Sequence, residues 1–215
     1  MFVEDRFKNF VLVQMKNLEA YDGLRPANHP YEFHHHSERV AKSMRSLALK
    51  TGYTESMADT LYWATLPHDI GKMSLPVEIW DLDERPTQDQ REERRSHTIL
   101  GLDIVRQNFA DECDKHPFLR LLCDIMANHH ESMDGSGYIG KDAAELSREV
   151  RMACICDAFD GWSVRRAGFD PDRDLSPKGV IHRMETEKTG QFDREILKSF
   201  KEMKLCTSKS YSPLL

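Results

Sequence analysis

The chain has 215 residues, enough for one large domain with a substantial buried core. Its 36 acidic and 30 basic side chains give a formal charge of -6, and no run of Lys or Arg is long enough to line a nucleic-acid groove, so we expect no nucleic acid polymer as a partner. No stretch approaches the roughly 20 consecutive apolar residues of a membrane span, and the N-terminus has acids where a signal peptide would be basic, which predicts a cytoplasmic protein without a membrane partner.

Apolar residues recur at spacings of three and four along most of the chain, which is typical of α-helices. No stretch alternates convincingly at period two, so the sequence predicts an all-α fold. The expected helices cover residues 3–20, 30–50, 54–68, 88–109, 117–130, 144–166, 176–188 and 193–204.

The pattern also predicts how the chain is organised. We expect an amphipathic helix with a connecting loop over residues 1–29, one domain over 30–206 and a tail over 207–215. The apolar face of the first helix can cover the helical bundle or pair two subunits. Covering the bundle is the preferred interpretation, and a homodimer is the alternative.

The segment YEFHHHSERVAKSMRSLAL contains three consecutive histidines, and the helical period decides which of them faces inward. Steps of four and three from His36 reach Val40 and further apolar residues, so His36 is the candidate metal ligand. Glu32 lies one turn before it on the same face. His34 and His35 share their stripes with charged residues, and we expect both to face solvent.

The next apolar helix ends in LPHDIGK, which places His68 and Asp69 side by side. Burying two adjacent ionisable groups costs free energy unless something neutralises them. A metal ion would neutralise the pair, so the remaining chain has to be searched for further ligands.

The segment RRSHTILGLDIV places His97 on an apolar helix face, with Gly101 four residues later. We expect the missing side chain of Gly101 to leave open space in which a ligand or substrate approaches. A lone histidine on such a face is more often a hydrogen-bonded core residue, so His97 counts as a ligand only together with the others.

The helix before a glycine-rich loop ends with His129 and His130, about 100° apart around the axis. The two imidazoles can converge on one pocket, or they can form a polar helix end that the helix dipole favours. Further along, Asp157 interrupts a strongly apolar helix. Because buried aspartates are rare unless they are paired or ligate a metal, Asp157 is a ligand or the partner of Arg151 or Arg165.

Imidazoles with a few carboxylates suit a transition metal better than Ca²⁺ or Mg²⁺. The candidates exceed what one ion needs and suit two. A carboxylate can bridge two ions, and water acidified by both becomes a nucleophile for phosphorus; Asp69 is the natural bridge. The candidate ligands are His36, His68, Asp69, His97, His129, His130 and Asp157.

The order of these residues, H…HD…H…HH…D, resembles the HD superfamily of metal-dependent phosphohydrolases, and specifically its HD-GYP subfamily, over residues 30–204. The segments that carry the resemblance are HDIGKMSLPVEIW, SHTILG, HHESMDGSGYIG, CDAFDGWSVRR and TGQFDREILKSF. The resemblance implies an all-α HD-domain helical bundle with a metal centre between the helices. It also implies two divalent transition-metal ions, Fe or Mn, and the hydrolysis of cyclic di-GMP to pGpG or GMP.

The resemblance also assigns roles by position. One ion would be held by His36, His68, Asp69 and Asp157, and the second by Asp69, His97, His129 and His130. Glu32 matches the ligand of a third ion in some members. Lys72 falls where the family uses a lysine against the substrate phosphate, so Asp69 and Lys72 are the catalytic candidates. Asp160 would orient a ligand or Lys72, and the further substrate-binding candidates are Gly137, Tyr138 and Arg166.

The sequence departs from the family pattern at two places. The GYP triplet reads Gly137, Tyr138 and Ile139, and RRAGF replaces an Arg-Pro-Tyr-Arg stretch. Both departures affect substrate contacts rather than metal ligands. Two alternatives therefore stay open, namely a phosphohydrolase of another nucleotide and a catalytically silent signalling module that binds a cyclic dinucleotide.

Overall fold

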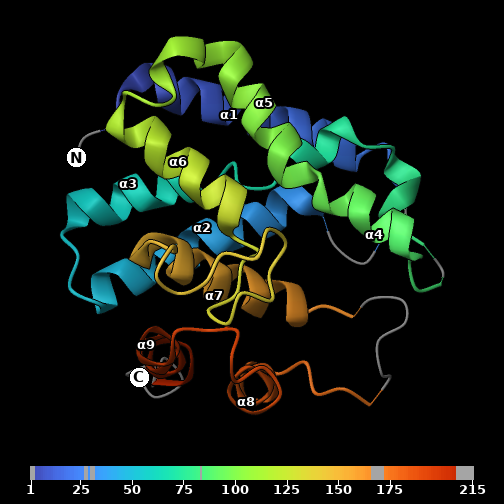
Figure 1. Ribbon diagram of the computed structural model, residues 1–215, viewed down its shortest axis with the longest axis vertical. Coiled ribbons are helices and arrows are strands. Elements are labelled where there is room, and N and C mark those ends of the chain that lie inside the picture. Colours follow the sequence, from blue (N-terminus) through green and yellow to red (C-terminus); the bar gives the residue numbers. More distant parts are fainter. Residues whose placement is uncertain (1–2, 27–28, 30–31, 83, 166–171, 207–215) are drawn as a thin grey trace, which may run out of the picture.

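The computed structural model describes residues 3–26, 29, 32–82, 84–165 and 172–206, and this part of the chain is helical and contains no strand (Figure 1). The all-α prediction is confirmed. The α-helices are α1 (Asp5–Asp22), α2 (Phe33–Lys50), α3 (Glu55–Thr65), α4 (Gln88–Arg95), α5 (His97–Phe109), α6 (Pro117–Asn128), α7 (Arg148–Trp162), α8 (Pro177–Thr186) and α9 (Arg194–Cys206). Short 3₁₀ turns are η1 (Ile70–Ser74), η2 (Val77–Ile79) and η3 (Ala110–Glu112).

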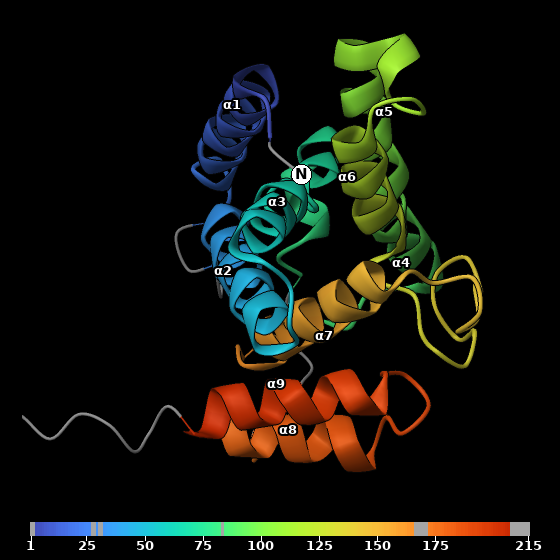
Figure 2. The same ribbon diagram turned by 90° about the vertical axis from the view of Figure 1, so that its left-hand side faces the viewer.

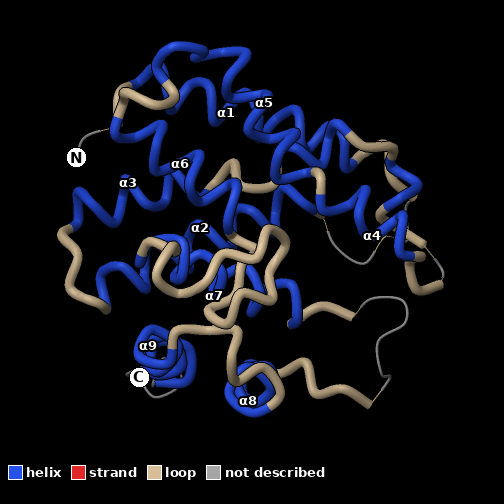
Figure 3. The backbone as a smooth tube through the Cα atoms, viewed as in Figure 1, coloured by secondary structure: helices blue, strands red, loops and turns tan. Residues whose placement is uncertain are grey.

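Helix α2 lies in the middle of the bundle and packs against α1, α3, α7 and α9. At one end α8 and α9 lie side by side, and at the opposite end lie α1 and α5 (Figures 1 and 2). The connection between α6 and α7 contains no helix (Figure 3). Among the helices that the structure describes, none combines the length and the apolar character that crossing a membrane requires.

Helix α1 covers the bundle, because its apolar residues Phe7, Phe10 and Val11 are buried in the main core. A buried ion-pair network fixes its C-terminal end. Asp22 accepts hydrogen bonds from the backbone N–H groups of Phe33 (3.0 Å) and His34 (2.9 Å), which are the first two residues of α2. Asp22 thereby caps α2 from another helix, since free N–H groups at a helix start need an acceptor.

The guanidinium of Arg25 completes this network. It donates to Asp22 at 2.7 Å and, through two nitrogens, to both carboxylate oxygens of Asp81 at 2.8 Å. The two acids carry charges that are compensated inside the protein, as buried charges require. The end of α1, the start of α2 and the segment after η2 are therefore held together.

The expected helix over residues 88–109 is two helices, α4 and α5, which meet at Ser96. Three side chains take the carbonyl oxygens that backbone N–H groups would use in a continuous helix. Ser96 Oγ donates to Glu93, the His97 imidazole to Arg94 and Thr98 Oγ1 to Arg95. Such local hydrogen bonds compete with the helix, and the break makes His97 the first residue of α5.

The space beside Gly101 is filled, contrary to the expectation of an opening for a ligand. A Cβ atom on Gly101 would meet the Met126 side chain at 2.7 Å. A Cβ atom on Gly71 would overlap the backbone of His97 and Gly101. The two glycines let η1 lie directly against the start of α5, which brings the turn of Asp69 next to His97.

We predict that Gly71→Ala destabilises the fold by about 3 kcal/mol or more, because the new methyl group meets backbone that cannot move aside. The matched variant Gly101→Ala meets a flexible methionine side chain and should cost about 1 kcal/mol. Urea unfolding followed by circular dichroism measures both. Equal unfolding midpoints for the two variants would contradict the close backbone contact.

Candidate metal centre

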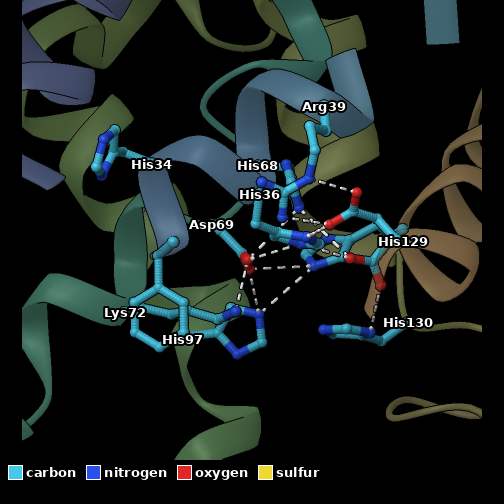
Figure 4. Close-up of polar contacts among 12 residues, drawn as sticks. His34, His36, Arg39, His68, Asp69, Lys72, His97, His129 and His130 are labelled. Carbon is cyan, nitrogen blue, oxygen red and sulfur yellow. Dashed lines mark hydrogen bonds and ion pairs between the residues drawn. The ribbon is translucent and has the colours of Figure 1, made fainter. Parts of the chain in front are cut away.

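Asp69 lies at the centre of a buried histidine cluster (Figure 4). Its Oδ1 atom is 3.2 Å from His97 Nε2 and 3.6 Å from His129 Nε2. Its Oδ2 atom is 3.5 Å from both His36 Nε2 and His68 Nε2. The two oxygens of one carboxylate therefore face two different pairs of imidazoles.

Asp157 closes the cluster from α7. Its Oδ1 atom is 3.0 Å from His36 Nε2 and 3.7 Å from His68 Nε2, and its Oδ2 atom is 3.5 Å from His130 Nδ1. Arg151, one of the alternative partners for Asp157, pairs instead with Asp193 at 3.2 Å. The structure thus brings all of the candidate ligands together except Glu32.

Several of these side chains reach the centre from helix ends. Helix α3 ends at Thr65 rather than at residue 68, because Pro67 follows, and α6 ends at Asn128. His68 and Asp69 therefore lie in a turn before η1, and His129 and His130 lie in the turn after α6. Adjacent residues in a turn can point into the same pocket, which neighbours inside a helix cannot do.

Backbone carbonyl groups orient three of the imidazoles. The Nδ1 atoms of His68, His97 and His129 lie 3.0, 2.6 and 3.0 Å from the carbonyl oxygens of Thr65, Arg94 and Met126. A carbonyl oxygen can only accept, so each Nδ1 carries the hydrogen. The Nε2 atoms are left as electron-pair donors directed at Asp69.

Asp160 orients the fourth imidazole. One of its oxygens is 2.7 Å from His36 Nδ1, and Arg39 donates to both oxygens of Asp160 at 2.8 and 2.9 Å. A carboxylate behind a ligating histidine fixes the ring and raises its basicity. Asp160 thus contacts a candidate ligand, as the sequence suggested, and the guanidinium of Arg39 holds it there.

Two buried polar atoms at the centre have no hydrogen-bond partner within the described ranges, namely His68 Nε2 and Asp69 Oδ1. Leaving such atoms unsatisfied costs free energy, and coordination to a metal ion would satisfy both. Ligand atoms lie within 4.8 Å of one another in two groups that share Asp69: His36, His68 and Asp69, and Asp69, His97, His129 and His130. This donor set fits two transition-metal ions.

The protonation states also fit metal binding. Burial lowers the pKa of the imidazoles of His68 and His97, and it holds the pKa of His130 well below its ordinary value. Burial alone would raise the pKa of Asp69, yet the charge of Lys72 holds that pKa well below its ordinary value. Neutral imidazoles and an ionised carboxylate are the forms that bind metals.

Lys72 supplies a buried positive charge beside Asp69. Its Nζ atom is 2.5 Å from Asp69 Oδ2. The ammonium group also lies over two aromatic rings, 4.4 Å from the centroid of Phe33 and 5.5 Å from that of Trp80. These contacts fix the lysine at the edge of the histidine cluster.

The glycine-rich loop after α6 brings Tyr138 to the centre. Its ring stacks on the imidazole of His130, with centroids 4.5 Å apart and an interplanar angle of 36°. Gly137 precedes it against Glu131, where a Cβ atom would lie 2.5 Å from the Glu131 Cα. Tyr138 therefore lies beside a metal candidate, and both predicted substrate-binding residues of this loop line the cavity at the centre.

Sequence reasoning missed Glu131. This side chain is 1% exposed, and its carboxylate accepts the backbone N–H groups of three consecutive loop residues, Ile139 at 2.7 Å, Gly140 at 2.9 Å and Lys141 at 2.8 Å. An acidic residue directly after two candidate ligands and before a glycine-rich loop was a visible signal. Its partners are backbone N–H groups, which every residue type except proline has, so the sequence does not identify them.

Three other expectations have different outcomes. Glu32 precedes α2, and its carboxylate lies 3.2 Å from His35 Nε2, apart from the ligand atoms around Asp69. His34 was expected to face solvent, which is wrong, because its Nδ1 atom lies 2.8 Å from Asp22 and Figure 4 shows it away from the cluster. Arg166 lies outside the described residues.

A cavity of about 1430 Å³ opens onto the cluster. Aromatic rings of Phe33, Trp80, Tyr138 and Trp162 contribute to its wall, together with many basic side chains. A cavity with this lining suits an anionic ligand that carries aromatic groups. The basic residues include Lys72, Arg85, Arg95, Arg165, Arg173 and Lys188.

Comparisons with known proteins agree with this geometry. A family model described as the HD domain matches residues 33–162. A cyclic di-GMP phosphodiesterase from Thermotoga maritima is 30% identical over 141 residues, which cover 65% of this chain and 37% of that protein. The 3'3'-cGAMP-specific phosphodiesterase 2 of Vibrio cholerae is 29% identical over 137 residues, covering 63% of this chain and 25% of that protein. The chain thus spans well under half the length of these relatives.

Solved structures share the fold. Bd1817, a HDG"Y"P protein from Bdellovibrio bacteriovorus, superposes with a TM-score of 0.62 at 17% identity, covering 93% of this chain and 61% of that one. The HD domain of the L. monocytogenes phosphodiesterase PgpH in complex with cyclic-di-AMP gives a TM-score of 0.59 at 17% identity, covering 95% and 99%. At this identity the likeness extends to the fold alone.

We predict that Asp160→Ala weakens metal binding about 10- to 100-fold, because the His36 imidazole loses the carboxylate that orients it. Competition between the protein and a fluorescent chelator for Mn²⁺ measures the affinity. Asp59→Ala is the matched control, since Asp59 also pairs with an arginine, Arg45, but on the exposed surface. If both variants bound Mn²⁺ like the unmodified chain, the orienting role of Asp160 would be excluded.

Proposed function

This chain belongs to the HD domain family, and on that premise we propose that it is a metal-dependent phosphodiesterase of the HD-GYP type that hydrolyses cyclic di-GMP to pGpG or GMP. The observation that carries the proposal is the buried Asp69 carboxylate, whose two oxygens face separate pairs of imidazoles beneath a basic cavity. We also propose a cytoplasmic location, and a homodimer is a separate hypothesis.

Two divalent ions, Fe or Mn, would share Asp69 as a common ligand. Bound there, they supply acidified water for attack on phosphorus and positive charge for the oxygens of the phosphate. Glu32 is retained as the ligand of a third ion in the proposal. The first ion would be held by His36, His68, Asp69 and Asp157, and the second by Asp69, His97, His129 and His130.

Lys72 is suited to bind a phosphate oxygen. Its ammonium group is buried, lies on the cavity wall and is held between Asp69 and the rings of Phe33 and Trp80. A positive charge fixed in a water-poor site stabilises negative charge that develops during the reaction more strongly than a mobile surface lysine would. We assign Lys72 the stabilisation of the phosphorane oxygens.

The relatives support a cyclic dinucleotide as substrate, because their names give cyclic di-GMP and 3'3'-cGAMP. Such a ligand carries two phosphates and two bases, which match the basic and aromatic wall of the cavity. A different cyclic dinucleotide is the second candidate, favoured by Ile139, which replaces the proline of the GYP triplet and is 55% exposed. The complete ligand set argues against the catalytically silent module.

The first experiment loads the protein with Fe(II) or Mn(II) without oxygen, adds cyclic di-GMP, 3'3'-cGAMP or cyclic-di-AMP in parallel, and follows the products by chromatography. Release of pGpG or GMP at the highest kcat/KM supports the proposal. Faster turnover of another cyclic dinucleotide would change the substrate. Metal-loaded protein that cleaves none of the three would contradict the phosphodiesterase.

We predict that Asp69→Ala abolishes turnover and lowers the bound metal measured by elemental analysis, because both ions lose a common ligand. Lys72→Ala should keep both metals and lower kcat about 100-fold, since only charge stabilisation is lost. Lys201→Ala is the control, because Lys201 pairs with Glu185 on the exposed surface. Full turnover in Asp69→Ala, or an unchanged kcat in Lys72→Ala, would remove that residue from the mechanism.

A further inference from the structure

The buried carboxylate of Glu131 fixes the loop that carries Tyr138. The Glu131 carboxylate accepts three backbone N–H groups at 2.7 to 2.9 Å, and Gly137 lies directly against its side chain. A carboxylate held by several N–H groups has one orientation, and it imposes that orientation on the loop. The position of Tyr138 over His130 therefore depends on a residue that does not line the cavity.

Arg95, the last residue of α4, contacts the same tyrosine. Its guanidinium carbon lies 4.9 Å from the Tyr138 ring centroid, and its side chain lines the cavity. The ring in turn stacks on His130. Arg95 thus contacts Tyr138, and Tyr138 contacts the metal candidate His130. The start of α5 fixes the position of Arg95.

The arginines of α4 differ in what holds them. Arg94 donates to the carbonyl oxygens of Ile79 and Trp80, and Arg91 donates to Pro86 and Gln88. The Arg95 guanidinium is exposed and has no hydrogen bond or carboxylate partner among the residues that the structure describes. Its five N–H donors are therefore available to a ligand in the cavity.

We propose that Arg95, placed over Tyr138, binds a second phosphate of the substrate that does not react, and that Glu131 positions this pair. The inference rests on the proposed function, because it presumes that the first phosphate lies at the metal centre beside Lys72. The ligand class is a molecule with two phosphodiester groups a short distance apart. A planar guanidinium suits the two free oxygens of such a group, which it can bind with parallel hydrogen bonds.

The test compares two substrates on the metal-loaded protein. Cyclic di-GMP has two phosphodiester groups, and bis(p-nitrophenyl) phosphate has one. Arg95→Ala should raise the KM for cyclic di-GMP about tenfold, with kcat, bound metal and the turnover of bis(p-nitrophenyl) phosphate nearly unchanged. Arg106→Ala removes one positive charge from α5 away from this cavity and controls for general electrostatic attraction.

Glu131→Gln tests the positioning residue. The amide keeps the size of the side chain but replaces one accepting oxygen with a donor, so we expect the KM for cyclic di-GMP to rise severalfold at constant kcat. The double variant Arg95→Ala with Glu131→Gln should be no worse than Arg95→Ala alone, because both changes act through one contact. Additive losses would show that Glu131 acts independently of Arg95 and would overturn its positioning role.

Equal losses on both substrates, or no change in KM for cyclic di-GMP, would overturn the role of Arg95. If the unmodified protein cleaves neither these two substrates nor another cyclic dinucleotide, the phosphodiesterase proposal fails, and a binding measurement then tests the role of Arg95. A hydrolysis-resistant phosphorothioate analogue of cyclic di-GMP then serves as the probe in calorimetry. A tenfold weaker binding by Arg95→Ala supports the phosphate subsite, and an unchanged affinity excludes it.

Discussion

The buried charge of Asp69 is the constraint on which the rest of the site depends. A carboxylate that is 1% exposed needs positive charge around it. Lys72 supplies the charge, and imidazoles from α2, α5 and the turns after α3 and α6 surround the carboxylate. Because these elements are distant in sequence, the packing of the bundle has to bring four segments to one point.

Two kinds of contact hold the candidate ligands in position. Backbone contacts fix the elements, most closely where Gly71 and Gly101 let η1 lie against α5. Hydrogen bonds behind the ligands then fix the side chains, with carbonyl groups behind His68, His97 and His129 and Asp160 behind His36. Both act from the side of the ligands that faces the protein, so the fold itself holds the candidate ligands in place.

Much of this arrangement could be predicted from the sequence, because it follows from spacing. The helical period separated His36 from its neighbours, and the adjacent ionisable pair His68 and Asp69 required a neutralising partner. What failed depends on contacts between distant segments. The orientation of His34 follows from Asp22 on another helix, the filled space at Gly101 from the Met126 side chain on α6, and the role of Glu131 from backbone amides. The residue pattern within one helix cannot predict such contacts between distant segments.

The network at Asp22 has a mechanical consequence. Asp22 holds the first two N–H groups of α2, and Arg25 ties it to Asp81. A rigid helix transmits force along its axis, so a pull or rotation applied to α1 is delivered to the first turn of α2, which also carries His36. A displacement of α1 would therefore move the first turn of α2, and with it the imidazole of His36 relative to the other candidate ligands.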